Sequence, residues 1–174
     1  MKKALVAGTF DPISIGHMDI IQRSRSLFDQ IHVVIFVNPD KTPLFSLEER
    51  LAMLAKSCES MEGVVVGSDD GMLVDYMMRN NIVATVRGVR NLEDAEYELD
   101  MAQYNKQLYS QGETIILPCS HELEFVSSNK IREALNNGQD VAKYLPTAIL
   151  PLFNEMWRHK QGRLLPNADN YTVN

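Results

Sequence analysis

The sequence predicts an α/β fold, namely a Rossmann-like, doubly wound sheet of five parallel strands with helices on both faces. Two observations support this prediction. Five short apolar segments recur along the chain, and unbroken apolar runs of this length are typical of strands buried on both faces. Between them lie segments in which apolar residues recur at helical spacing, and this alternation favours a parallel sheet with helical crossovers.

The predicted elements follow one another in the order that such a sheet requires. Strands are predicted at 4–7, 31–37, 64–66, 82–86 and 114–117. Helices are predicted from about 16 to 28, from a capping box at Ser46 and Glu49 onward, and at 71–80, 91–109, 128–135 and 146–157. In the capping box, the Ser46 hydroxyl accepts from the third helical amide while the Glu49 carboxylate reaches back.

The length of the chain fits one compact domain. Its 174 residues are close to the usual size of a single domain, which we place at residues 1–160. Residues 161–174 are polar and show no periodicity, so we expect a C-terminal tail there.

Composition argues against several classes of protein. The formal net charge is −6, whereas non-specific nucleic-acid binding needs a basic field, so we expect no nucleic-acid partner. Cys58 and Cys119 form no Cys-x-x-Cys pair, so neither a zinc site nor a redox motif is indicated. No apolar run approaches the roughly 20 residues that span a bilayer, and the first residues lack the pattern of a signal peptide. We therefore expect a cytoplasmic protein without membrane contact.

The segment after the first predicted strand, Gly8-Thr-Phe-Asp-Pro-Ile-Ser-Ile-Gly-His17, has the properties of an anion site. Parallel sheets bind ligands beyond the carboxyl ends of their strands. We expect Gly8 to allow a sharp turn and Gly16 to let backbone approach a ligand. His17 falls in the first helical turn, where free amides and the helix dipole favour phosphate, and Thr9 adds a hydroxyl. The alternative is an ordinary strand–turn–helix with a solvated histidine.

Cationic side chains follow two other predicted strands. Lys41 lies in a proline-flanked loop after the second strand, and Arg87 and Arg90 flank Gly88 where the fourth strand ends. Arginine forks suit phosphate oxygens, and Gly88 would remove a side chain from the path of the ligand. Glu98, on the next helix, could orient Arg90 or meet a ribose. The alternatives are a solvated lysine, a surface ion pair and a solvated acidic face of a helix.

The loop after the fifth predicted strand leads into another helix start. Ser127, Ser128 and Asn129 offer hydroxyl and amide groups to a phosphate, and Arg132 lies one turn further on. A plain N-cap cluster is the alternative. All four segments follow strands of one parallel sheet, so we expect them to converge on a single site at one edge.

Taken together, these motifs resemble those of a known family. Gly8-Thr-Phe-Asp-Pro followed by Ser-Ile-Gly-His17 resembles the signature of the nucleotidyltransferase superfamily with the T/H-x-G-H motif. Arg87-Gly-Val-Arg90, the Glu96-Tyr-Glu98 run and Ser127-Ser-Asn-Lys-Ile-Arg132 narrow the resemblance to the bacterial phosphopantetheine adenylyltransferases, over residues 1 to about 157. The resemblance implies that ATP and 4′-phosphopantetheine are converted to dephospho-coenzyme A and pyrophosphate, a step of coenzyme A biosynthesis.

The resemblance also implies roles for individual residues. Positions that act in catalysis are matched by Thr9, Lys41 and His17, with His17 as the transition-state stabiliser. Positions that bind the acceptor are matched by Thr9, Lys41, Leu73 and Arg87. Positions that bind ATP are matched by Thr9, Phe10, His17, Gly88, Val89, Arg90, Glu98, Leu123, Glu124, Phe125, Val126, Ser127, Ser128 and Asn129. The chain departs from the family pattern at Ser14, where histidine or threonine is usual, and at Asn129, where a third serine is common.

The family resemblance implies partners as well. It implies a homohexamer built as a dimer of trimers, inhibition by coenzyme A, and magnesium. No carboxylate cage for a metal is visible in the sequence, so we expect magnesium to arrive with ATP. Two alternative functions stay open: an adenylyl- or cytidylyltransferase for another phosphorylated acceptor such as a pyridine mononucleotide, and a non-catalytic nucleotide-binding regulatory module.

Overall fold

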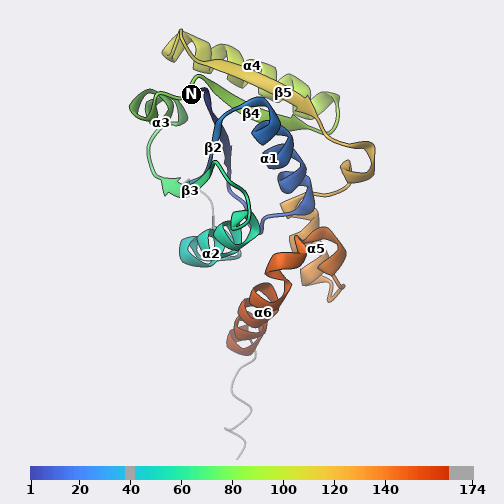
Figure 1. Ribbon diagram of the computed structural model, residues 1–174. Helices are drawn as coiled ribbons and strands as arrows, with labels where there is room; N and C mark the ends of the chain where they lie inside the picture. The colour runs from blue at the N-terminus through green and yellow to red at the C-terminus, as the bar shows by residue number, and fades with distance from the viewer. Residues whose placement is uncertain (38–41, 165–174) are drawn as a thin grey trace, which may run out of the picture.

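The computed structural model describes residues 1–37 and 42–164 and confirms the predicted architecture. Five parallel strands form one sheet in the order β3-β2-β1-β4-β5, and helices cover it (Figure 1). The strands are β1 (Lys3–Gly8), β2 (Gln30–Phe36), β3 (Val64–Asp69), β4 (Ala84–Val89) and β5 (Glu113–Pro118).

Six α-helices lie where the periodicity predicts them. They are α1 (Ile15–Leu27), α2 (Leu47–Cys58), α3 (Leu73–Asn80), α4 (Leu92–Leu108), α5 (Ser128–Asn136) and α6 (Leu150–Leu164). The predicted capping box of α2 is present, since the Ser46 hydroxyl accepts from the Glu49 amide and Glu49 accepts from the Ser46 amide. Helix α6 passes both its predicted end at residue 157 and the predicted domain limit at residue 160, and the limit itself remains a prediction.

Alternate residues of β1 face two different hydrophobic cores. Ala4 and Val6 belong to the larger core, which contains Ile21 of α1 and Leu54 of α2. Leu5 points to the other face, where Met77 of α3 lies in a smaller cluster. This alternation follows from the two-residue period of a strand. Helices α5 and α6 lie at the end of the molecule far from the N terminus (Figure 1), and their buried residues extend the larger core.

The sheet separates between β1 and β4. Strand β1 pairs with β2 along its whole length, from Lys3 to Gly8, but with β4 only at Ala4↔Ala84 and Leu5↔Thr85. The chain runs outward from β1 through β2 and β3 on one side, and through β4 and β5 on the other. The strand order therefore reverses here, and such switch points hold the ligand sites of α/β sheets.

Strand β4 is longer than predicted. It ends at Val89 rather than at residue 86, because its last residues pair with β5 as far as Val89↔Pro118. Arg87 and Gly88 therefore lie within the strand and not beyond it. Arg87 spans the opening beside β1, where its Nη1 donates to the Ala7 carbonyl at 2.8 Å.

Candidate active site

The turn after β1 depends on a phenylalanine rather than a glycine. Phe10 has φ = 47°, the left-handed conformation that non-glycine residues seldom adopt. Its ring is 2% exposed and meets the His17 ring edge-on, with centroids 5.0 Å apart. A Cβ atom on Gly8 would lie 3.0 Å from the Phe10 ring. The expectation that Gly8 itself makes the turn is therefore wrong: Gly8 ends β1, the backbone of Phe10 makes the turn, and the missing side chain of Gly8 leaves room for the Phe10 ring.

His17 is tied to the start of its own helix. Ser14 is the N-cap of α1, and its backbone amide donates to His17 Nδ1 at 3.0 Å. A backbone N–H can only donate, so Nδ1 is the unprotonated nitrogen of a neutral imidazole, and Nε2 carries the hydrogen. The helix therefore presents His17 as a neutral donor. Gly16 precedes it, and a Cβ atom added to Gly16 would lie 3.5 Å from the Val126 carbonyl oxygen.

Burial keeps the His17 ring uncharged. The pKa of His17 is lowered from 6.5 to about 4, first because the ring is desolvated and then because the positive charges of Arg90 and Arg87 oppose a second proton. Between pH 6 and pH 8 the imidazole is therefore neutral, and protonation of His17 should not limit activity in that range.

This lowered pKa predicts how stability depends on pH. The unfolded chain takes up a proton on His17 as the pH falls through about 6.5, whereas the folded protein does not until about pH 4. The contribution of His17 to the free energy of unfolding is thus present above pH 6.5 and is lost between pH 6.5 and pH 4. Urea unfolding at pH 7 and pH 5 should show a larger loss for the wild type than for His17→Gln. Equal losses would contradict the lowered pKa.

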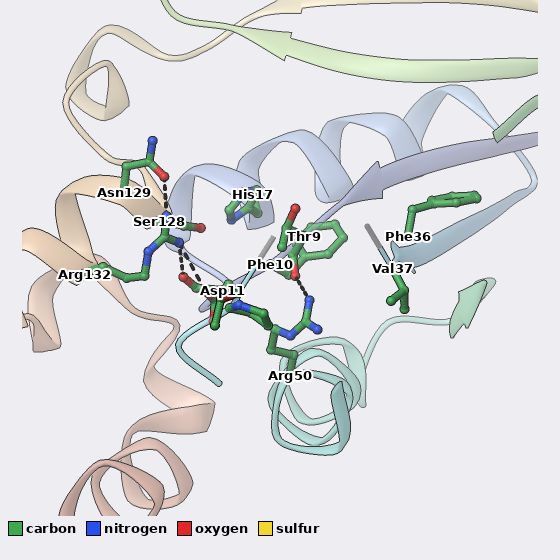
Figure 2. A pocket seen from close by; sticks show the side chains of 12 residues that line it. Thr9, Phe10, Asp11, His17, Phe36, Val37, Arg50, Ser128, Asn129 and Arg132 are labelled. Carbon is green, nitrogen blue, oxygen red and sulfur yellow. Dashed lines mark hydrogen bonds and ion pairs between the residues drawn. The ribbon is translucent and has the colours of Figure 1, made fainter. Parts of the chain in front are cut away.

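Two cavities meet at His17. The first, of about 410 Å³, is lined by Thr9, Phe10, Asp11, His17, Phe36, Val37, Thr42, Pro43, Arg50, Ser128, Asn129 and Arg132. Figure 2 shows Thr9, Phe10 and His17 between the α5 residues and Phe36 with Val37. The second, of about 650 Å³, lies along β4, α4 and the loop before α5. Phe10, His17, Ser128 and Asn129 line both, so one ligand can extend from one cavity into the other past the His17 ring.

A buried carboxylate organises the first cavity. Asp11 is 2% exposed, and its oxygens accept from the amides of Leu44 and Phe45, both at 2.8 Å. Arg132 of α5 donates to the Asp11 carbonyl at 2.6 Å and lies 3.4 Å from its carboxylate (Figure 2). Arg50 of α2, 4% exposed, donates to the Thr9 carbonyl at 2.9 Å. Three segments that are distant in sequence are thus joined around one anionic group.

Some of the polar side chains at the start of α5 are already hydrogen-bonded within the protein. Ser127 is the N-cap and accepts from the Lys130 amide, as the alternative of a plain cap requires. Ser128 donates its hydroxyl hydrogen to the Pro12 carbonyl at 2.8 Å. This hydroxyl therefore connects α5 to the turn after β1 and is not the phosphate donor that we expected. Asn129 accepts from Arg132 at 2.5 Å and keeps its NH₂ group for a ligand. The first amides of a helix also have no partner within it, so they suit an anion.

Arg87 of β4 and Arg90, which follows the strand, have different partners from those expected. Glu98, predicted to orient Arg90, instead binds Arg87 through two hydrogen bonds of 2.8 Å and 2.7 Å. Arg90 is held by Asp94, one helical turn closer on α4, at 2.7 Å and 3.0 Å. Arg87 uses three of its five N–H groups, two for Glu98 and one for the Ala7 carbonyl, so two are left for a ligand. The carboxylates therefore fix both cations beside the second cavity.

Gly88 is required by packing. A Cβ atom there would lie 2.8 Å from Cγ1 of Ile20 on α1. Packing against Ile20 is thus a second reason for glycine here, and the expectation that Gly88 clears the path of a ligand stays a prediction for a residue that lines the second cavity.

Gly88→Ala should consequently destabilise the protein by about 1–3 kcal/mol, the usual cost of overpacking. Ile20→Val combined with Gly88→Ala should restore part of this loss, because it removes the Cδ1 methyl 3.0 Å from that Cβ. Urea unfolding of the single and double variants measures both effects. A double variant no more stable than Gly88→Ala, after the separate cost of Ile20→Val is subtracted, would show that the Ile20 Cδ1 methyl is not the obstacle.

The structure brings most of the predicted site residues together. The two cavities are lined by Thr9, Phe10, His17, Arg87, Gly88, Arg90, Glu98, Leu123, Val126, Ser127, Ser128 and Asn129. Val89, Glu124, Phe125 and Leu73 are not among the lining residues. Phe125 is 69% exposed, and Leu73 packs against the smaller core cluster, as Phe36 of the first cavity also does. Lys41 lies outside the described residues.

Sequence reasoning missed several residues of the site. Asp11 and Ser14 belong to the quoted motif, so their position was a signal. The bonds of Asp11 to the distant Leu44–Phe45 segment, and the bond of Ser14 to His17 within the motif, were not visible in it. Arg50 gave no signal, because it follows the capping box of α2 and looks like a solvated helical residue. Asp94 and Tyr97 of α4 also line the second cavity.

Within residues 1–37 and 42–164, no helix combines the length and apolar character needed to cross a bilayer. In the same described ranges, no three histidine, cysteine, aspartate or glutamate side chains cluster as metal ligands would.

Comparison with known proteins agrees with this geometry. The model of the cytidylyltransferase-like family matches residues 5–134. A phosphopantetheine adenylyltransferase of Actinobacillus pleuropneumoniae is 41% identical over 87% of this chain and 96% of its own length. One from Thermotoga neapolitana is 40% identical over 92% of this chain and 98% of its own. A solved structure from Vibrio parahaemolyticus, described as a nicotinate-nucleotide adenylyltransferase, has a TM-score of 0.66 over 90% of this chain and 95% of its own, at 22% identity, and shows the shared fold alone.

The parallel sheet, the switch-point cavities and the family match define this protein as a nucleotidyltransferase of the cytidylyltransferase-like class. Within that class, the chain belongs to the phosphopantetheine adenylyltransferase family.

Proposed function

We propose that this protein transfers the adenylyl group of ATP to 4′-phosphopantetheine, giving dephospho-coenzyme A and pyrophosphate in coenzyme A biosynthesis. The observation that carries the proposal is the position of His17, a neutral donor where two cavities meet. Arg87 and Arg90 lie beside one cavity, and Arg50 and Arg132 beside the other. Relatives with about 40% identity over most of the chain bear this enzyme's name.

The chemistry needs positioning more than a base. The acceptor phosphate is already an anionic nucleophile, and it attacks the α-phosphorus of ATP in line while the bond to pyrophosphate breaks. Negative charge grows on the α-phosphate oxygens in the transition state. The Nε2–H group of His17 donates to one of these oxygens, and a preorganised donor at such a place gives much of the rate enhancement.

The remaining roles follow from the two cavities. The nucleotide occupies the second cavity beside Gly88, Arg90 and the loop before α5, and Arg87 with Thr9 meets the acceptor phosphate. The family resemblance, and not the cavities, adds Lys41 and Leu73 to the acceptor site in this proposal. Magnesium enters bound to the phosphates of ATP and offsets the charge of the leaving pyrophosphate.

Two rival functions predict different outcomes in one assay. Pyrophosphate release is measured with magnesium-ATP and either 4′-phosphopantetheine, nicotinic acid mononucleotide or no acceptor. We expect release with phosphopantetheine alone. Pyrophosphate release only with the pyridine nucleotide would show that this nucleotide is the acceptor instead of phosphopantetheine. Binding of ATP without pyrophosphate release under any condition would favour a regulatory module.

We also propose that the protein is a cytoplasmic homohexamer, a dimer of trimers, that coenzyme A inhibits. Several large apolar or aromatic side chains of α4 are exposed and are available to an interface between copies of the chain: Leu92, Tyr97, Leu99, Tyr104 and Leu108. Light scattering after size-exclusion chromatography should give six times the 19.7 kDa chain mass. A monomer would contradict the hexamer, and activity unchanged by added coenzyme A would contradict the inhibition.

A further inference from the structure

Ser14 makes more contacts with His17 than a helix cap requires. Its side chain is 1% exposed, and its Oγ lies 2.9 Å from His17 Nδ1. The same Oγ accepts from the His17 backbone amide at 3.4 Å. Because the amide supplies the hydrogen in that second bond, the hydrogen of the hydroxyl is available for Nδ1. Two donors of Ser14, the amide and the hydroxyl, therefore converge on one ring nitrogen.

The arrangement differs from the other capping box of this protein. At the start of α2, Ser46 faces Glu49, whose carboxylate also pairs with Lys160 at 2.7 Å, while the Ser46 hydroxyl donates to Glu48 at 2.8 Å. At the start of α1, the reciprocal partner is the histidine that lies between the cavities. A hydrogen on Nδ1 would point at the Ser14 amide, which can only donate, so the amide disfavours both the other tautomer and the doubly protonated ring. The hydroxyl hydrogen stabilises the neutral ring further by donating to the unprotonated Nδ1.

The charged groups around His17 favour the same state. Arg87 of β4 and Arg90, which follows the strand, oppose a second proton on the ring. The nearby carboxylates are engaged elsewhere, since Glu98 and Asp94 of α4 bind those arginines, and Asp11 faces Arg132 of α5. Phe10 packs edge-on against the ring. Ser14 is therefore the polar group that orients the imidazole directly.

We propose that Ser14 is a positioning residue: its hydroxyl and amide fix the orientation and tautomer of His17, so that Nε2–H points to the reacting phosphate. This inference rests on the proposed adenylyl transfer for its functional consequence. At this position the serine hydroxyl thus orients the imidazole in addition to capping the helix.

The test compares Ser14→Ala with two matched variants. Ser14→Thr keeps the hydroxyl, and Ser46→Ala removes the equivalent cap of α2 without touching His17. Nitrogen-15 spectra of the histidine side chains report the tautomer in the protein without substrate, and His17→Gln identifies the His17 signals. We expect the Nε2–H form in the wild type, the same tautomer with a higher titration midpoint in Ser14→Ala, which keeps only the amide donor, and recovery of the midpoint in Ser14→Thr.

Turnover provides the second readout. Ser14→Ala should lower kcat about 3- to 10-fold, in line with the loss of one hydrogen bond, with little change in KM for ATP, while Ser46→Ala keeps wild-type kcat. His17 signals and kcat unaltered in Ser14→Ala would reduce Ser14 to a plain cap and overturn the proposal. Failure of the wild type to use phosphopantetheine would count against the proposed function instead, because the spectra test Ser14 without any acceptor.

Discussion

Replacing His17 with alanine is expected to lower turnover about 100- to 1,000-fold, the usual cost of losing one donor to a developing oxyanion. The reason is geometric. The Nε2–H group is fixed by the bond between Nδ1 and the Ser14 amide, and no reorganisation is needed when charge grows on the α-phosphate. Steady-state kinetics with saturating ATP and phosphopantetheine measure the effect.

The His17→Ala result needs two controls. His159→Ala removes an exposed imidazole from α6 and should keep wild-type turnover. ATP affinity, measured by calorimetry, should remain close to that of the wild type, because the donor acts mainly in the transition state. Near-native turnover of His17→Ala would remove this residue from the mechanism.

Asp11→Ala is expected to have the largest effect on stability, about 3–5 kcal/mol, as when one partner of a buried ion pair is removed. The substitution leaves the Leu44 and Phe45 amides without their acceptor. It also leaves Arg132 without its carboxylate. Urea unfolding, extrapolated to water, gives the change in the free energy of unfolding.

Asp29→Ala is the matched control for Asp11. The Asp29 carboxylate also meets a positive group, the N-terminal amine at 4.0 Å, but it is 61% exposed. Its loss should cost no more than about 1 kcal/mol, since solvent screens such pairs. Equal destabilisation by both substitutions would show that the Asp11 network does not hold the three segments together.

Local patterns were sufficient to predict the fold. Each strand was visible as a short apolar run and most helices as a 3.6-residue recurrence, whereas a capping box marked the start of α2 and α4 was recognised by its charged side. The strand ends were less accurate, because the last residues of β4 are defined by their pairing with β5 and not by their own hydrophobicity. Arg87 looked like a loop residue for this reason.

The candidate site was partly predictable. Residues next to strand ends could be assigned to one edge of the sheet, and twelve of the predicted residues do line the two cavities. Pairings across the fold were not visible in the sequence. Glu98 reaches Arg87 rather than Arg90 because of where α4 lies along β4. The side chain of Ile20 on α1 leaves no room for a Cβ atom at Gly88. Such contacts depend on tertiary packing, which local patterns do not encode.

Transfer of label from ATP tests the central claim most directly. Wild-type protein is given 4′-phosphopantetheine and ATP labelled with ³²P at either the α- or the γ-phosphate. Attack at the α-phosphorus predicts α-label in dephospho-coenzyme A and γ-label only in pyrophosphate. Transfer of the γ-label to the acceptor, or no labelled acceptor from either ATP, would contradict adenylyl transfer by this site.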